Sequence, residues 1–275
     1  LDAKHGYNSF LAYWGLFFAC TGLIDGITQE TTRAVAASRE TQVRGNANPW
    51  KLGAAIGAAL AVIALLAGLF TMGRIVPTHP GTATGLLGFG LLSYAFQAVL
   101  SGILSGSGLW NRYAALVALD SGVRLVLAVV VWALGGGLVE FLAITVIGAL
   151  SWAVVLALAP VRVQLDVDRG AFVRRVGSAM VASGASAALI TGFPTAASAA
   201  FPAATAGAAV AAINNAVMLT RAPVLVPLQR FQSALVVRFV ERRDTVYRAL
   251  VAPVGAIMGV GIVAPLIDTS QPPST

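Results

Sequence analysis

Two opposite charges lie inside an apolar stretch of this sequence. Asp120 and Arg124 fall within the apolar segment Tyr113–Leu134, and their spacing of four residues places both on one face of a helix, where they can pair. Charge at membrane depth is costly and usually faces a protein interior or a watery cavity. Two interpretations follow: a self-neutralised pair that locks helix packing, or a pair that faces a hydrophilic cavity and meets substrate or ions.

Further charges follow the first apolar segment, Asn8–Ile27. Asp25 stands near its end, and Glu30 and Arg33 belong to the polar block that comes next. If the membrane span ends near Ile27, Asp25 lies within one turn of the cytoplasmic end, where it is solvated, caps the helix or faces a cavity. By the same argument Glu30 and Arg33 form a solvated pair near the interface or contribute to a substrate or ion site.

Neutral polar residues and prolines complete the candidates. Gln97, Asn214 and Asn215 lie in apolar segments and either hydrogen-bond between helices or line a polar route. Pro194 is expected to kink its helix, and Pro202 suits an outer turn. Both prolines are hinge candidates for a transporter. The alternative is that they only shape the packing of the helices.

Constellations typical of enzymes are absent from the sequence. His5 and His79 are predicted on external stretches without neighbouring metal-ligand spacing, and Cys20 is the one cysteine. There is no phosphate-binding loop of the G-x-x-x-x-G-K-[ST] type and no convincing nucleophile triad. We therefore expect no catalysis, no metal and no cofactor, with a coupling cation, H⁺ or Na⁺, left open.

Composition indicates the elements that must position these residues. Hydrophobic residues make up 57% of the 275, charged residues 11%, and the mean hydropathy is +0.82. Soluble domains carry about 25% charged residues, so a large soluble globule is excluded. The high glycine and alanine content favours a bundle of closely packed membrane helices over a β-barrel. The net charge of +7 is explained by membrane topology, and no nucleic-acid partner is expected.

The sequence predicts an all-α, polytopic bundle of about eight membrane-spanning helices. The predicted spans are Asn8–Ile27, Leu52–Met72, Thr84–Leu104, Tyr113–Leu134, Phe141–Ala159, Val176–Ala200, Ala203–Leu219 and Ala249–Ile267. With this parse, 15 of the 18 Lys and Arg residues fall on one side, only Lys4 and Arg74 on the other, and Arg124 inside a span. The basic side is therefore predicted to be cytoplasmic, in a multi-pass protein of the cytoplasmic membrane.

These spans suggest two lobes. Residues 1–160 would form a first lobe of five helices, 161–175 a basic cytoplasmic linker, 176–268 the start of a second lobe with three helices, and 269–275 a polar tail. Residues 229–247 place apolar residues at helical spacing among arginines, as in a basic amphipathic surface helix. An N-terminus on the outer side suggests that one helix is missing before residue 1.

Several motifs resemble those of polysaccharide-lipid flippases. They are a helix running into Gln29-Glu30-Thr31-Thr32-Arg33-Ala34-Val35, a basic loop before a helix containing Phe193-Pro194, and a helix ending in Leu219-Thr220-Arg221-Ala222-Pro223. The chain resembles helices two to nine of the multidrug/oligosaccharidyl-lipid/polysaccharide exporter superfamily, in particular its actinobacterial polysaccharide biosynthesis type. The resemblance implies a fragment of a two-bundle transporter that moves a lipid-linked sugar to the outer leaflet by alternating access.

The resemblance also implies partners and roles. Membrane lipid and a lipid-linked glycan would be bound, and glycan-synthesis enzymes are candidate partners. Arg33 and Arg124 would be cavity cations for an anionic pyrophosphate, tuned by Asp25 and Asp120. Two alternatives stay open: an ion-coupled multidrug exporter, and a non-transporting membrane partner of cell-envelope glycan synthesis. A membrane glycosyltransferase or acyltransferase is disfavoured, because the external loops are short and poor in acids and histidines.

Overall fold

The computed structural model describes residues 5–161, 163–200, 234, 236–237 and 240, and within them it is helical and has no strand. The elements are α1 (His5–Thr41), α2 (Pro49–Ile75), α3 (Pro80–Gly106), α4 (Trp110–Ala133), α5 (Leu138–Ile147), the 3₁₀ turn η1 (Gly148–Leu150), α6 (Ser151–Leu158) and α7 (Arg169–Ala200).

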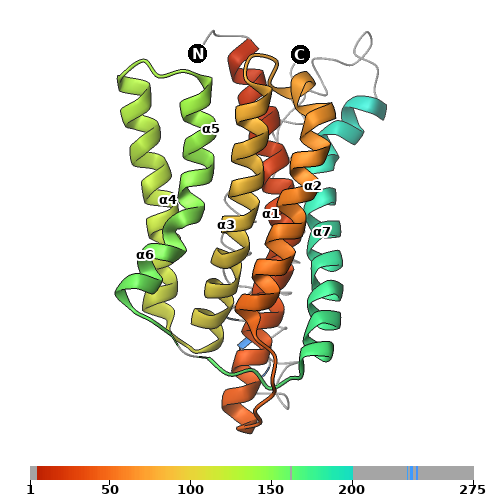
Figure 1. The fold of residues 1–275 in the computed structure, drawn as a ribbon, viewed down its shortest axis with the longest axis vertical. Coiled ribbons are helices and arrows are strands. Elements are labelled where there is room, and N and C mark those ends of the chain that lie inside the picture. Colours follow the sequence, from red (N-terminus) through yellow and green to blue (C-terminus); the bar gives the residue numbers. More distant parts are fainter. Residues whose placement is uncertain (1–4, 162, 201–233, 235, 238–239, 241–275) are drawn as a thin grey trace, which may run out of the picture.

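The helices run up and down side by side (Figure 1). α3 lies at the centre, packed against α2 and α1 and, on its other side, against α4, α5, η1 and α6. α7 lies along α1 on the side of the bundle away from α4 (Figure 1). α3 is accordingly the most buried of the apolar helices.

Among the described residues, five spans are long and apolar enough to cross a membrane: Ser9–Thr41, Pro49–Ile75, Pro80–Gly106, Trp110–Ala133 and Leu138–Leu158. They overlap the first five predicted segments and identify a multi-pass membrane protein. The predicted number of eight is not confirmed. The sixth segment is the larger part of α7, whereas Ala203–Leu219 and Ala249–Ile267 lie outside the described residues, as does most of 229–247.

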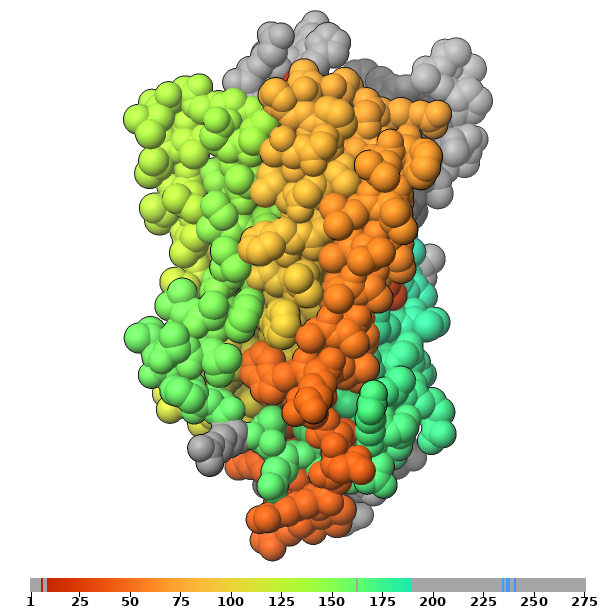
Figure 2. Space-filling view, in the orientation of Figure 1, coloured from red at the N-terminus to blue at the C-terminus, as the bar shows by residue number. Residues whose placement is uncertain are grey.

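The outward faces of the spans are apolar. α2 exposes Ile63, Leu66, Leu69 and Phe70, and α4 exposes Leu125, Val126 and Trp132. In Figure 2, α2 and α3 form one continuous surface of side chains, with α7 along its edge. Such a surface suits contact with lipid chains rather than water.

Glycines set the spacing of the central helices. A Cβ added at Gly53 or Gly57 of α2 would collide with side chains of α3, and one at Gly102 or Gly106 of α3 would collide with α1. Each of these two pairs of glycines, four residues apart on its helix, is therefore a close packing contact. Gly81 and Gly85 of α3 have the same spacing but open space around them, so spacing alone does not make a contact.

Basic residues collect at one end of the bundle. This end, at the bottom of Figure 1, is where α1 finishes, α2 begins, α3 passes to α4 and α7 begins. Arg39, Arg44, Lys51, Arg112 and Arg169 belong to it, whereas Arg74 stands at the opposite end of α2. We call it the basic end.

Candidate functional site

Asp120 and Arg124 form an ion pair on α4. Arg124 Nη2 lies 2.9 Å from Asp120 Oδ1, and the two side chains are only 18% and 10% exposed, respectively. The pairing expected from their spacing is therefore made. Asp120 lies ten residues after the start of α4, or about 15 Å along the helix axis. The pair thus sits at middle depth on a helix whose other faces are mostly exposed and apolar.

The pair is held between α5 and α1. A Cβ added at Gly148 would overlap both the Arg124 and Asp120 side chains, so glycine is what lets the pair lie against the backbone where α5 ends. From the other side, the Arg124 guanidinium carbon lies 5.5 Å from the centre of the Phe18 ring on α1, a cation–π distance. Arg124 Nε is buried and has no hydrogen-bond partner among the described residues. It can therefore donate a hydrogen bond to a ligand.

The fifth predicted span is interrupted at the same place. Instead of one helix over Phe141–Ala159, α5 and α6 are joined by the 3₁₀ turn η1. Ser151 Oγ donates to the Gly148 carbonyl at 2.7 Å, and Ser93 Oγ of α3 donates to the Ala149 carbonyl at 2.8 Å. Trp152 Nε1 donates to Ser93 Oγ at 3.0 Å. Side chains thus satisfy the backbone groups freed by the interruption, as membrane burial demands.

Asp25 does not lie at the end of its helix, so the capping role is excluded. α1 continues to Thr41, sixteen residues further, because its polar second half packs on α3. Tyr94 of α3 donates its hydroxyl proton to Asp25 Oδ1 at 2.8 Å. Gln97, also on α3, is buried, and its Oε1 has no partner among the described residues. The acid and the amide therefore belong to the middle of the bundle.

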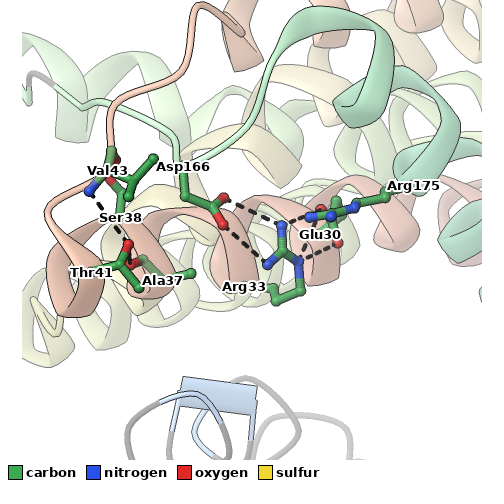
Figure 3. A network of polar contacts seen from close by, with 8 residues as sticks. All are labelled: Glu30, Arg33, Ala37, Ser38, Thr41, Val43, Asp166 and Arg175. Carbon is green, nitrogen blue, oxygen red and sulfur yellow. Dashed lines mark hydrogen bonds and ion pairs between the residues drawn. The ribbon is translucent and has the colours of Figure 1, made fainter.

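Glu30 and Arg33 form part of a larger network at the basic end, drawn in Figure 3. The Arg33 guanidinium bonds Glu30 at 2.8–3.0 Å and reaches Asp166 at 3.3–3.5 Å. Arg175 Nη1 of α7 lies 3.9 Å from Glu30 Oε1. We call Glu30, Arg33, Asp166 and Arg175 the basic-end network. Glu30 is buried within it, so of the two interpretations drawn from the sequence the solvated pair does not describe this residue.

Asp166 is positioned by backbone pairing between two connecting segments. The amide of Gly45 donates to the Leu165 carbonyl at 2.7 Å, and that of Ala47 to the Val167 carbonyl at 3.3 Å. Asn46 Oδ1 accepts from the amide of Arg169, the first residue of α7. Residues 169–175 of the predicted linker therefore belong to α7, and residues 165–169 are tied to the connection between α1 and α2.

Sequence reasoning missed several of these positions. Asp166 and Arg175 were not singled out, although Asp166 and Asp168 are the only acids in an otherwise basic stretch. Also missed were Gly22 and Gly26, four residues apart on α1. An added Cβ at Gly26 would overlap the backbone of Met180 on α7, and one at Gly22 would collide with Ala187. The spacing of four was the available signal.

The remaining candidates are only partly described. Pro194 lies within α7, whose last turns lean away from the axis of its first part in Figure 1. Pro202, Asn214 and Asn215 lie outside the described residues. The described part of the chain has no group of three or more His, Cys, Asp or Glu side chains that could hold a metal ion.

This chain is similar to proteins that are longer than it is. An uncharacterized protein of Mycobacterium bovis is 34% identical over 273 residues, which cover 96% of this chain and 63% of that protein. An uncharacterized protein of Mycobacterium tuberculosis is 34% identical over 275 residues, covering 94% of this chain and 61% of its own length. This chain therefore spans less than two thirds of these relatives. No family model and no solved structure matches the chain.

Proposed function

We propose that the chain forms the membrane-embedded part of a transporter that moves lipid-linked oligosaccharide or polysaccharide precursors across the cytoplasmic membrane by alternating access. The observation that carries the proposal is the Asp120–Arg124 pair, buried at middle depth with an unused donor on Arg124. Intramembrane ionisable residues in a bundle interior commonly mark substrate or ion pathways.

The chemistry of the pair suits an anionic substrate. A guanidinium presents its donors in a planar fork that matches phosphate oxygens, and charge-assisted hydrogen bonds of this kind are the strong ones. Without substrate, Asp120 neutralises Arg124 and so limits the cost of the buried cation. When a pyrophosphate-linked glycan arrives, Arg124 would turn its donors to the phosphates, leaving Asp120 and Asp25 to bind a coupling cation.

The contact between α1 and α7 supports a moving interface. Gly22 and Gly26 of α1 and Gly184 of α7 remove the side chains that would otherwise interlock the two helices. A smooth contact lets one helix shift along the other with little repacking. In this proposal the basic-end network holds the cytoplasmic end of the contact closed and separates when the transporter opens toward the cytoplasm.

Translocation into proteoliposomes tests the proposal. The purified full-length protein would be reconstituted with a pyrophosphate-linked oligosaccharide lipid, and the glycan exposed on each face would be measured with a membrane-impermeant lectin. We expect the protein to equilibrate the glycan lipid across the bilayer faster than protein-free vesicles do. Equal rates with and without the protein would contradict the proposal and leave a non-transporting membrane partner as the better reading. Transport of amphipathic cations instead would point to a multidrug exporter.

A further inference from the structure

A cavity of about 1230 Å³ opens at the basic end. Its walls come from the end of α1, the connection from residue 42 to 48, the start of α2, the turn after α3 and the extended segment that precedes α7. It shares no residue with the Asp120–Arg124 pair or with the basic-end network. The cavity therefore needs an explanation of its own.

The lining of the cavity is positive. Arg39 and Arg44 line it, and none of its described lining residues is Asp or Glu. Neither arginine is in an ion pair with a residue of the described part of the chain. Arg39 Nη1 donates to the Gly106 carbonyl at 3.3 Å, which fixes the guanidinium and leaves its other donors for a ligand. Two cations in a described lining that holds no carboxylate favour an anion.

The start of α2 adds to the positive charge that lines the cavity. Asn48 and Pro49 line the cavity, and Asn48 Oδ1 accepts a hydrogen bond from the Lys51 amide at 3.1 Å. The N-terminus of a long helix carries a partial positive charge of about half a unit. Its charge therefore has the same sign as that of Arg39 and Arg44.

The position and size of the cavity indicate what kind of anion would fit it. α2, one of the candidate membrane spans, begins here. The half-buried Trp50, a residue type favoured at the headgroup layer, forms part of the wall. Val161, Val163 and Leu109 give the wall an apolar side. Drug-sized pockets measure about 300–1,000 Å³, so a single phosphate ion would leave most of this space unfilled.

We propose that this cavity is a binding site for the phosphate-bearing headgroup of an anionic lipid drawn from the leaflet at the basic end. Arg39 and Arg44 bind the phosphate, the α2 N-terminus reinforces them, and Trp50 with the apolar wall accommodates the glycerol and the first part of the chains. The site does not depend on the proposed transport activity. It would attach the connecting segments 42–48 and 161–168 to the membrane surface.

Native mass spectrometry of the purified full-length protein tests the site. The protein would be released from mixed micelles containing phosphatidylglycerol or phosphatidylcholine, with and without inorganic phosphate as competitor. We expect phosphatidylglycerol to be retained and phosphatidylcholine to be lost. A basic residue near an anionic surface contributes about 1 kcal/mol, so Arg39→Gln with Arg44→Gln should weaken phosphatidylglycerol binding roughly tenfold or more. Added salt should weaken it further.

Two variants make the result interpretable. Arg74→Gln removes an exposed cation at the opposite end of α2 and should leave lipid retention unchanged. Arg44→Gln alone spares the Arg39 contact with Gly106 and should still weaken binding severalfold. Competition by inorganic phosphate would assign the site to soluble phosphate compounds and overturn the lipid assignment. Equal retention by the double variant and Arg74→Gln would overturn the site itself.

Discussion

Arg33 and Asp166 join α1 to the segment that leads into α7: Arg33 Nη2 lies 3.3 Å from Asp166 Oδ1, across 133 positions of sequence. The same nitrogen bonds Glu30 at 2.8 Å, so one guanidinium bridges two carboxylates. Arg33 and Asp166 are 27% and 17% exposed, whereas Glu30 is 8% exposed. The three charges therefore differ in how much water screens them, which predicts unequal effects of their removal.

Asp166→Asn should destabilise the protein slightly. The pair with Arg33 is partly exposed, and such pairs contribute about 1 kcal/mol or less. Arg33→Gln should cost about 3 kcal/mol, because it leaves the buried Glu30 charge without its main partner. Thermal unfolding in detergent measures both variants. If Asp166→Asn cost more than Arg33→Gln, Asp166 rather than Glu30 would be the buried member of the network.

Gly26→Ala should disturb the contact between α1 and α7. The added methyl group would overlap the backbone of Met180, which cannot move without shifting α7. Overpacking of this kind costs about 1–3 kcal/mol, which would appear as a lower midpoint of thermal unfolding. Gly15→Ala on the same helix is the matched control, because nothing lies within 4 Å of its added Cβ. Equal midpoints for the two variants would show that α1 and α7 do not pack as described.

Gly148→Ala should displace the Asp120–Arg124 pair. Its methyl group would occupy the space of the Arg124 side chain at the end of α5. We expect translocation to fall about tenfold, the effect of weakening one charge-assisted contact by roughly 1.4 kcal/mol. Gly122→Ala on α4 has open space around the added Cβ and serves as control. Unchanged translocation by correctly folded Gly148→Ala would separate the position of the pair from transport.

Gln42→Gly should stabilise the turn that ends α1. Gln42 has φ = 55°, a left-handed conformation that glycine adopts without steric cost. Its replacement should raise the unfolding free energy by up to about 1 kcal/mol, less the extra flexibility of glycine in the unfolded chain. The measurement is again thermal unfolding, with Gln42→Ala as the comparison. A lower midpoint for Gln42→Gly than for Gln42→Ala would contradict the described turn.

The sequence predicted apolar spans well and their ends poorly. Hydropathy placed the first five spans, but it ended the first at Ile27, whereas α1 runs to Thr41. The polar second half of α1 is satisfied inside the bundle: Thr28 Oγ1 donates to the Ala98 carbonyl, and Thr32 Oγ1 bonds Ser105 Oγ. Such tertiary partners are invisible to a hydropathy pattern, which treats every polar residue as a residue near water.

The candidate site was predictable only where its geometry was local. The Asp120–Arg124 pair follows from a spacing of four on one helix. The pairing of Arg33 with Asp166 depends on two connecting segments that meet through backbone hydrogen bonds, and no local pattern predicts that meeting. Gly148 is likewise one of many glycines until the structure places the ion pair against it. The residues that could not be predicted from the sequence are therefore those whose partners are distant in the sequence.

The central claim is that the Asp120–Arg124 pair serves transport of an anionic lipid-linked glycan, and translocation by the neutralised pair tests it most directly. Asp120→Asn with Arg124→Gln removes both charges together, so neither is left buried and unpaired. Arg74→Gln, which removes an exposed cation at the end of α2 opposite the basic end, is the matched control. We predict at least a tenfold slower translocation for the double variant, the result of losing one charged hydrogen bond to phosphate, and a normal rate for Arg74→Gln. A double variant that folds and translocates the glycan lipid as fast as the unmodified protein would contradict the account.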